Sequence, residues 1–254
     1  MLNNNIIYEP RDYRNNLKSE RFIHFQVSYK ETDLLIAIDK PSFNKDIPEF
    51  ILKKIYYYRD ILNDYFKVNL NFKESFSPIS NDFNAHDFIQ QMINATAIAD
   101  IGPMGSVAGA FSQYIGKDVK NKFLVKEIII ENGGDIYLDI KEETIISIYA
   151  GNSVLSQKIG IKIMPDYSPL GICTSAGTVG HSISFGKADA VVIGCKNTLI
   201  ADSFATKYGN YVKTEDDINN VIEMINNNSQ FFCGAIIKND KIGLCGKFDF
   251  VSLG

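Results

Sequence analysis

Alternating apolar and polar residues indicate two strands near the start of the chain. Residues 21–30 (RFIHFQVSYK) alternate in polarity, and residues 33–39 (DLLIAID) form a short apolar run. A period of two is typical of a strand with one buried face. The polar Glu31-Thr32 pair between the runs predicts a turn, so we expect the two strands to form a hairpin.

The next pattern has the period of a helix. Pro48 suits the first turn of a helix, where its missing N–H costs least. Apolar residues then recur at steps of four and three positions, which places them in one stripe on one face. These residues are Ile51, Ile55, Tyr58, Leu62 and Tyr65. The polar stretch over residues 71–84 that follows is the only candidate for an internal boundary.

The second half of the chain is rich in predicted strands. Two helices precede them, over residues 87–100 and from Met104, separated by Gly102-Pro103. The predicted strands cover residues 126–131, 144–150, 158–164 and 188–195. Two helices follow, over residues 198–208 and 215–226, and a final hairpin pairs residues 231–238 with 241–245. This order predicts a mixed α/β chain folded as one domain over residues 1–254.

Composition excludes several classes of protein. The chain has 254 residues, of which 22% are charged and 45% hydrophobic, as in an ordinary globular protein. A net charge of −4 argues against a nucleic-acid binder. No apolar run approaches the roughly 20 residues that span a bilayer, and the start lacks the pattern of a signal peptide. We therefore expect a cytoplasmic protein without a membrane segment.

The four cysteines do not form a recognisable metal or redox motif. They stand at Cys173, Cys195, Cys233 and Cys245, with no CxxC pair among them. Zinc sites and dithiol redox sites usually bring such pairs together, so the spacing argues against both.

The first glycine-rich segment, residues 100–106, lies at the start of a predicted helix. Glycines there let backbone N–H groups converge on a phosphate, which the helix dipole also favours. The alternative is a tight turn between two helices, and this segment alone favours that alternative. Gly105, Ala108 and Gly109 would let another backbone pack very close.

The second segment, residues 131–135, lies between strands. Asn-Gly and Gly-Gly are strong hairpin signals, so a plain β-turn is one interpretation. The other is a turn whose bare backbone lets a ligand approach, with Asp135 contacting a ribose or a ring. The segment alone does not decide between the two.

The third segment, residues 171–182, combines glycines with hydroxyl side chains and ends near His181. Hydroxyls and backbone N–H groups suit phosphate oxygens or the polar edge of a heterocycle. Cys173 is either a nucleophile or, as we favour, a small buried residue. His181 is either functional or a structural hydrogen-bonding residue, and on sequence alone the structural role is favoured.

The fourth segment, residues 201–206, places a carboxylate and a hydroxyl on one helix face. Asp202 and Thr206 are four residues apart. Hard oxygen ligands of this kind suit Mg²⁺, which takes one or two carboxylates together with substrate phosphates and water. Taken alone, an ordinary helix aspartate is the simpler interpretation.

Taken in order, the four segments resemble the ApbE-like superfamily, whose enzymes are FAD:protein FMN transferases. Residues 100–102 resemble its Asp-x-Gly-Gly segment, and residues 131–136 its Asn-x-Gly-Gly-Asp-Ile segment. Residues 174–177 resemble its Thr-Ser-Gly turn, and residues 201–206 its Ala-Asp-x-x-Ala-Thr helix. The resemblance covers about residues 100–210 and implies an α+β fold of mixed, largely antiparallel sheets packed with helices.

The resemblance also implies ligands and residue roles. It implies Mg²⁺ held by Asp202, Thr206 and the Gly105 carbonyl, and FAD as the nucleotide. Asp202 and His181 would serve catalysis. The residues that would contact the cofactor are Asp100, Gly102, Gly133, Gly134, Asp135, Thr174, Ser175, Gly177 and Thr178. A flavoprotein would accept the FMN, and a homodimer is left open.

Some residues depart from the transferase pattern. Ser106-Val107 stands where the family usually has Lys-Gly, and Phe111 where it has an aspartate. Residues 1–80 are divergent, whereas residues 85–254 carry the motifs. The strings IENGGDIYL and GICTSAGTVGHSISFGKADAVV look closer to an uncharacterised branch linked to sulfur assimilation and homocysteine formation. Two alternatives to flavin transfer therefore stand: a non-catalytic flavin or nucleotide-binding protein, and an accessory factor in sulfur metabolism.

Overall fold

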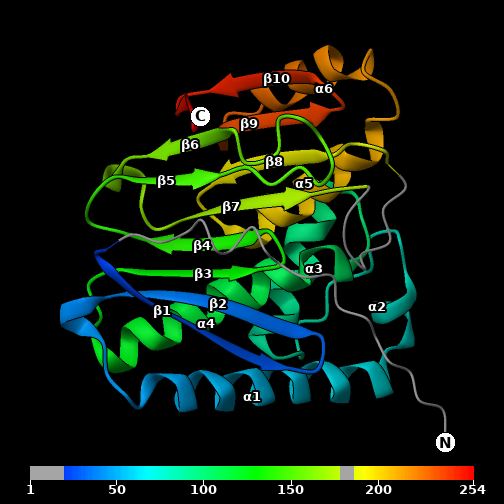
Figure 1. Ribbon diagram of the computed structural model, residues 1–254. Helices are drawn as coiled ribbons and strands as arrows, with labels where there is room; N and C mark the ends of the chain where they lie inside the picture. The colour runs from blue at the N-terminus through cyan, green and yellow to red at the C-terminus, as the bar shows by residue number, and fades with distance from the viewer. Residues whose placement is uncertain (1–19, 178–185) are drawn as a thin grey trace, which may run out of the picture.

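One long antiparallel sheet runs through the molecule (Figure 1). The structure is a computed structural model that describes residues 20–177 and 186–254. In spatial order the strands are β1 (Phe22–Tyr29), β2 (Thr32–Asp39), β3 (Ile128–Asn132), β4 (Asp135–Asp139), β7 (Leu170–Ser175), β8 (Ala190–Cys195), β9 (Phe231–Lys238) and β10 (Lys241–Gly246). Each strand pairs with its neighbours in antiparallel register.

A second, smaller sheet covers part of one face of the long sheet. Its strands are β5 (Thr144–Ser147), β6 (Ile159–Ile163) and β11 (Asp249–Ser252), with β6 in the middle. Ile146 and Ile161 of the small sheet share a buried core with Ile136, Ile172 and Val192 of the long sheet. This packing of sheet on sheet fixes one face of strands β4, β7 and β8.

Helices cover the opposite face of the long sheet. The longer ones are α1 (Ile47–Val68), α3 (Asp87–Ala99), α4 (Val107–Phe123), α5 (Thr198–Tyr211) and α6 (Asp217–Asn226), and short helices are α2 (Leu70–Glu74), η2 (Lys40–Ser42) and η3 (Pro103–Ser106). A further short helix, η4 (Pro165–Tyr167), packs its Tyr167 against the core shared by the two sheets. Two buried cores lie beneath them, one under α1, α3 and α4 and one under α5 and α6. Because side chains alternate along a strand, every second residue of β4 and β7 faces these helices.

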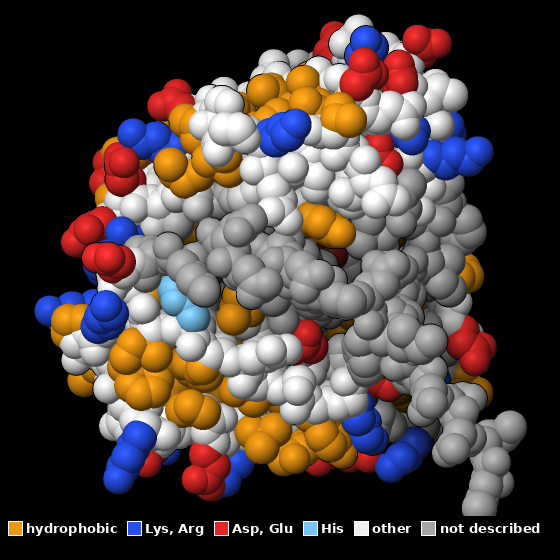
Figure 2. Space-filling model, in the orientation of Figure 1, with side chains coloured by type: hydrophobic (Ala, Val, Ile, Leu, Met, Phe, Trp, Pro, Cys, Tyr) orange, Lys and Arg blue, Asp and Glu red, His pale blue; other side chains and the backbone are white. Residues whose placement is uncertain are grey.

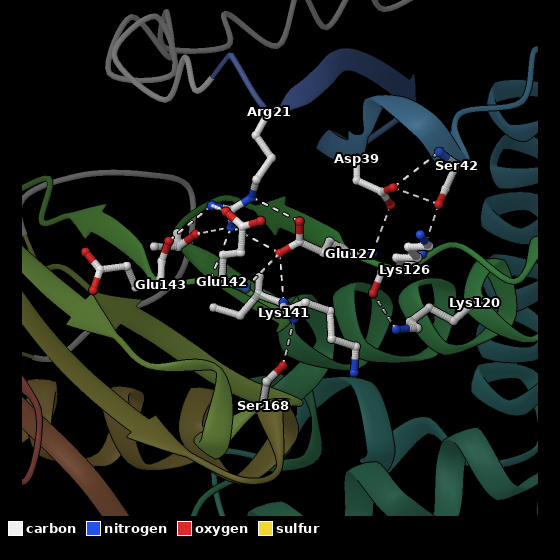
Figure 3. A network of polar contacts seen from close by, with 12 residues as sticks. Arg21, Asp39, Ser42, Lys120, Lys126, Glu127, Lys141, Glu142, Glu143 and Ser168 are labelled. Atoms are coloured by element: carbon white, nitrogen blue, oxygen red, sulfur yellow. Dashed lines mark hydrogen bonds and ion pairs between the residues drawn. The ribbon is translucent and has the colours of Figure 1, made fainter.

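The N-terminal hairpin belongs to the same sheet as the rest of the chain. Strand β2 pairs with β3, with Ile36 opposite Ile130. Figure 3 shows the polar contacts that tie this end of the sheet together. The Arg21 guanidinium lies 3.0 Å from a Glu127 oxygen, and Glu127 also accepts the Lys141 N–H at 2.8 Å. Both parts of the chain therefore form a single compact domain.

Most of the predicted elements are present. The stripe of α1 is buried at Ile51, Ile55, Tyr58, Leu62 and Tyr65, as its period indicated. The final hairpin is β9–β10, as predicted. The first hairpin turns one residue earlier than expected, because β2 already begins at Thr32. No helix in the described part of the chain is long and apolar enough to cross a membrane.

Two segments differ from the sequence-based expectation. The polar stretch over residues 71–84 is not an internal boundary, because α2 already covers its start and the Ser75 carbonyl packs against Gly102. Residues 170–175, interpreted only as part of a ligand-binding segment, form the central strand β7. Its small residues fit a close helix: a Cβ added to Gly171 would lie 2.5 Å from Thr198 Cα on α5.

On the surface shown in Figure 2, apolar side chains gather mainly over β6 and β10 at the top and over β1 and α1 at the bottom, with smaller groups between them. Charged and polar side chains lie around both groups on the described part of this face. A globular protein commonly keeps this much apolar surface exposed.

Candidate functional site

The candidate site lies where helices α4 and α5 meet strand β4. We call this place the α4–α5 junction, and define it by Gly105, Gly109, Asp135, Asp202 and Thr206. Helix α5 contacts α4, η3 and β4, which brings these residues together from three parts of the sequence. The start of α5 is fixed by a side chain, since Asn197 Oδ1 accepts the N–H groups of residues 199 and 200.

Asp202 is buried in this junction and is held by the first turn of α4. Its side chain Oδ2 accepts the Gly109 N–H at 2.8 Å, which satisfies a donor that α4 leaves unpaired at its start. Gly109 has to be glycine here: an added Cβ would lie 2.7 Å from the Thr198 carbonyl and 2.9 Å from Asp202 Cβ. The expected close backbone approach at this glycine is confirmed.

Thr206 lies one turn further along the same face of α5 and approaches η3. A Cβ added to Gly105 would be 3.7 Å from Thr206 Cγ2. The resemblance assigned Gly105, Asp202 and Thr206 to the metal. All three lie where α5 packs against η3 and the start of α4.

Asp135 enters the junction from the sheet. It is the first residue of β4, and its neighbour two residues on, Tyr137, belongs to the core on the helix side. Asp135 therefore faces the helices, where the Ser112 hydroxyl donates to its backbone carbonyl at 2.8 Å. Its side chain is 7% exposed, and its Oδ1 has no hydrogen-bond partner. The contact of Asp135 with a ribose or a ring, which the sequence left open beside a plain turn, stays a prediction.

Burial raises the pKa of both carboxyl groups. It raises the pKa of Asp202 to about 7, while the hydrogen bond from Gly109 lowers it. For Asp135, burial and then the nearby charge of Asp202 raise the pKa well above its usual value. Neither carboxylate forms an ion pair with a described lysine or arginine. The pair is therefore poorly compensated as long as both groups are ionised.

The first glycine-rich segment has evident structural roles. Asp100 is exposed and ends α3 in the left-handed conformation, with φ of 59°. Gly102 packs directly onto the Ser75 carbonyl, which leaves no room for a side chain. Asp100 and Gly102 therefore form a tight turn between two helices. Of the three residues predicted in this segment, only Gly105 lies beside Thr206.

Gly133 and Gly134 form the tight turn between β3 and β4. Both have positive φ, 65° and 99°, as a two-residue hairpin loop requires. The Gly134 N–H donates to Glu131 Oε1 at 2.7 Å, and the Gly134 carbonyl accepts the Thr174 N–H at 3.1 Å. The turn therefore holds Asp135 at the end of β4 and backs onto β7.

The predicted residues at the end of β7 and just beyond it do not all converge on the junction. Thr174 pairs with Val192, whose side chain lies in the core beneath the small sheet, so alternation points Thr174 away from α5. Ser175 lies on the other face, where its Oγ would be 3.0 Å from a Cβ added to Gly209 of α5. Gly177 is exposed. The predicted residues Thr178 and His181 lie outside the described residues.

Cys173 is a buried thiol rather than an exposed nucleophile. It is fully buried and its Sγ donates to the Thr198 carbonyl at 3.4 Å. Burial and the charges of Asp135 and Asp202 raise the pKa of this thiol well above its usual range. A thiolate is the reactive form of cysteine, so this environment opposes nucleophilic chemistry. The favoured interpretation of Cys173 as a small buried residue agrees with the structure.

Sequence reasoning missed the polar residues that support the junction. Asn132 Nδ2 donates to the Ala108 carbonyl at 3.2 Å, and Gln113 Oε1 accepts the Thr198 N–H at 2.9 Å. Gln113 and Asn132 are almost fully buried, at 5% and 7% exposed. A polar residue inside an otherwise apolar helix or strand could have indicated these supporting contacts, because a polar group buried there is normally hydrogen-bonded.

The donors in the junction suit a hard divalent cation. Two aspartates and a threonine hydroxyl are oxygen ligands, and Asp135 Oδ1 is buried without a hydrogen-bond partner among the described residues. Within residues 20–177 and 186–254, no cluster of three or more His, Cys, Asp and Glu side chains could hold a metal by itself. A cation here would therefore complete its shell with hydroxyl, carbonyl, water or phosphate oxygens, as Mg²⁺ commonly does.

Comparisons with known proteins identify a family and structures of similar fold. A family model described as "AbpE bacteria" matches residues 14–228. UPF0280 proteins of Methanococcus maripaludis and Methanocaldococcus jannaschii are 38% and 37% identical, over 89% and 87% of this chain and 92% and 90% of those proteins. Among solved structures, a mutant of the flavin transferase ApbE from Vibrio cholerae has a TM-score of 0.58 at 11% identity, covering 88% of this chain and 96% of that one. The apo flavinyl transferase ApbE of Pseudomonas stutzeri has a TM-score of 0.55 at 11% identity, covering 91% and 94%.

Proposed function

Since this chain belongs to the AbpE bacteria family and has the fold of the ApbE flavin transferases, we propose that it binds FAD with Mg²⁺ and transfers FMN to a hydroxyl group of an acceptor protein. The first part of this proposal is a flavin-nucleotide site that needs a divalent cation. The second part is the group transfer itself, and the two parts are separable by experiment.

One observation carries the proposal. Asp202 and Thr206 lie on the same face of α5, beside Gly105 and close to the buried, unpartnered Asp135 oxygen. Such a set of oxygens around an uncompensated carboxylate pair is suited to Mg²⁺ and poorly suited to a phosphate without a metal, because like charges repel. Bound Mg²⁺ would supply neutralisation of the pyrophosphate charge.

The proposed transfer is balanced as follows. The oxygen of the acceptor hydroxyl forms a bond to the FMN phosphorus, the bond from that phosphorus to the oxygen bridging the two phosphates breaks, and AMP leaves. In the proposal, Asp202 and Thr206 hold the cation that neutralises the phosphates, and His181 takes the hydroxyl proton. The turn at residues 174–177 would contact the nucleotide. These assignments follow the ordered motifs of the chain.

A second candidate function is nucleotide binding without transfer. Ser106, which stands in place of the usual lysine, is completely buried, and its hydroxyl donates to the Pro103 carbonyl at 3.2 Å. It offers neither a positive charge nor a free hydroxyl to a phosphate. This observation favours a site whose phosphate binding depends wholly on the cation. An accessory role in sulfur chemistry at Cys173 gains no support, since that thiol is buried and its pKa is raised.

The test is AMP release from FAD. Purified protein with FAD, Mg²⁺ and a flavin-accepting protein should release AMP and attach FMN covalently to the acceptor, and Asp202→Asn should abolish both. Release of no AMP while FAD still binds with Mg²⁺ would select the binding protein. Full AMP release by Asp202→Asn would contradict the proposed role of the junction.

A further inference from the structure

Asp135 and Asp202 form a buried pair of carboxylates that reach one place from opposite sides. Asp135 comes from the sheet, at the start of β4, and Asp202 from helix α5. Each is 7% exposed. Asp202 Oδ2 accepts the Gly109 N–H, whereas Asp135 Oδ1 has no hydrogen-bond partner among the described residues. The motif resemblance assigned a metal role to Asp202 alone of the two.

A pair of this kind needs compensation. Helix α5 contacts strand β4, and two negative charges buried at such a contact repel strongly. A lysine, an arginine or a cation can neutralise such a pair. No lysine or arginine within residues 20–177 and 186–254 forms an ion pair with either carboxylate. A divalent cation between the two groups would compensate both at once.

The other polar groups near Asp135 are already engaged. Glu131 Oε1 accepts the Gly134 N–H. The Cys173 thiol donates to the Thr198 carbonyl and also lies beside the Asp135 carboxyl group, with which it interacts. Asn132 uses its side-chain amide on the Ala108 carbonyl. Buried polar atoms almost always have a partner, so a buried carboxylate oxygen that has none among the described residues indicates a ligand that binds there.

We propose that Asp135 is a direct ligand of the divalent cation, so that the cation bridges strand β4 and helix α5. The inference rests on the proposed Mg²⁺ site and adds a ligand to it. The cation then couples three parts of the chain: the Gly-Gly turn that positions Asp135, the first turn of α4 that holds Asp202, and α5 itself. Oxygen ligands from both carboxylates select a hard cation, Mg²⁺ or Mn²⁺.

The first experiment measures Mn²⁺ binding by electron paramagnetic resonance of the free ion, with and without FAD. Asp135→Asn keeps the shape of the side chain and removes its charge. It should weaken Mn²⁺ binding about tenfold or more, as should Asp202→Asn. The matched control is Asp139→Asn on the same strand. The Asp139 carboxylate lies 2.7 Å from Lys120 Nζ and is not part of the junction. This control should bind Mn²⁺ like the wild type.

The outcomes separate the inference from the proposed function. Unchanged Mn²⁺ affinity in Asp135→Asn, together with weak binding in Asp202→Asn, would overturn the inference alone. Absence of Mn²⁺ binding by the wild type, with FAD present, would overturn both. A second measurement needs no variant: Fe²⁺ with ascorbate and hydrogen peroxide should cleave the wild-type backbone near residues 133–135 and near Asp202. Cleavage near Asp202 only would count against Asp135 as a ligand.

Discussion

Asp202 has two roles at the scale of a single residue. Its Oδ2 accepts the Gly109 N–H, which completes the hydrogen bonding of the first turn of α4. Its charge lies in the proposed cation site. A substitution can remove either property separately, because asparagine still presents an oxygen acceptor whereas alanine presents none.

The first prediction uses this difference. Asp202→Asn should abolish Mg²⁺-dependent stabilisation while leaving the metal-free protein as stable as the wild type or more so, since a repelling charge is gone. Asp202→Ala should lose the metal effect and also about 1 kcal/mol of stability with the cap. Urea unfolding in EDTA and in Mg²⁺ measures both quantities. Equal stability of the two variants in EDTA would contradict the capping role.

The second prediction compares two glycines of the junction. Gly109→Ala should destabilise the protein by about 1–3 kcal/mol, because its Cβ would lie 2.7 Å from the Thr198 backbone carbonyl. Gly105→Ala should cost less, since the nearest atom, at 2.5 Å, is the movable Cδ1 of Ile101. Thermal unfolding of the two variants gives the order. A larger loss in Gly105→Ala would refute this explanation of the packing.

At the scale of elements, the start of α5 decides where Asp202 and Thr206 lie. Asn197 caps the helix by accepting two backbone N–H groups, at 2.9 and 3.3 Å. Thr198 then packs against β7 at Gly171, which sets the distance between helix and sheet.

The third prediction concerns this cap. Asn197→Ala should cost about 1 kcal/mol of stability and weaken Mg²⁺ binding indirectly, because a frayed first turn loosens Asp202. Asn197→Asp retains an acceptor and should recover most of the stability. Chemical denaturation and Mn²⁺ binding of both variants provide the check. A full loss in Asn197→Asp would show that more than capping is involved.

The sequence predicted the elements better than their contacts. The stripe of α1 and the Gly-Gly turn have local signals, a helical period and a demand for positive φ. Strand β7 was missed because its glycine and hydroxyl residues look unlike a core strand, and only the close approach of α5 explains them.

The candidate site was predictable only in part. Asp202 and Thr206 are four residues apart on one helix, so their common face follows from local geometry. The meeting of Asp135 with Asp202 depends on tertiary packing between β4 and α5, and no local pattern reports such packing. For the same reason the hydrogen bond from Gly109 to Asp202 could not be foreseen.

At the scale of the whole molecule, the buried carboxylates couple stability to pH and to metal. The folded-state pKa of Asp202 is raised from 3.8 to about 7 by burial. Between these values the folded protein retains a proton that the unfolded chain releases. The contribution of Asp202 to the free energy of unfolding of the metal-free protein therefore falls as the pH rises through this window.

The fourth prediction follows from that sign. In EDTA, the melting temperature should be higher at pH 5 than at pH 8, and Asp202→Asn should reduce the difference. Saturating Mg²⁺ should raise the melting temperature at pH 8 far more than at pH 5, because protons compete with the cation. Differential scanning fluorimetry provides the curves. The same pH dependence in wild type and Asp202→Asn would contradict the assignment.

The most direct test of the account is calorimetric titration of FAD into the wild-type protein with and without Mg²⁺. The site contains two buried aspartates, and no basic side chain in the described residues pairs with them. We therefore expect FAD to bind in the presence of Mg²⁺ and to bind much more weakly, or not at all, in EDTA. Binding of FAD with the same affinity in EDTA would contradict the claim that a cation at Asp202 and Thr206 holds the nucleotide.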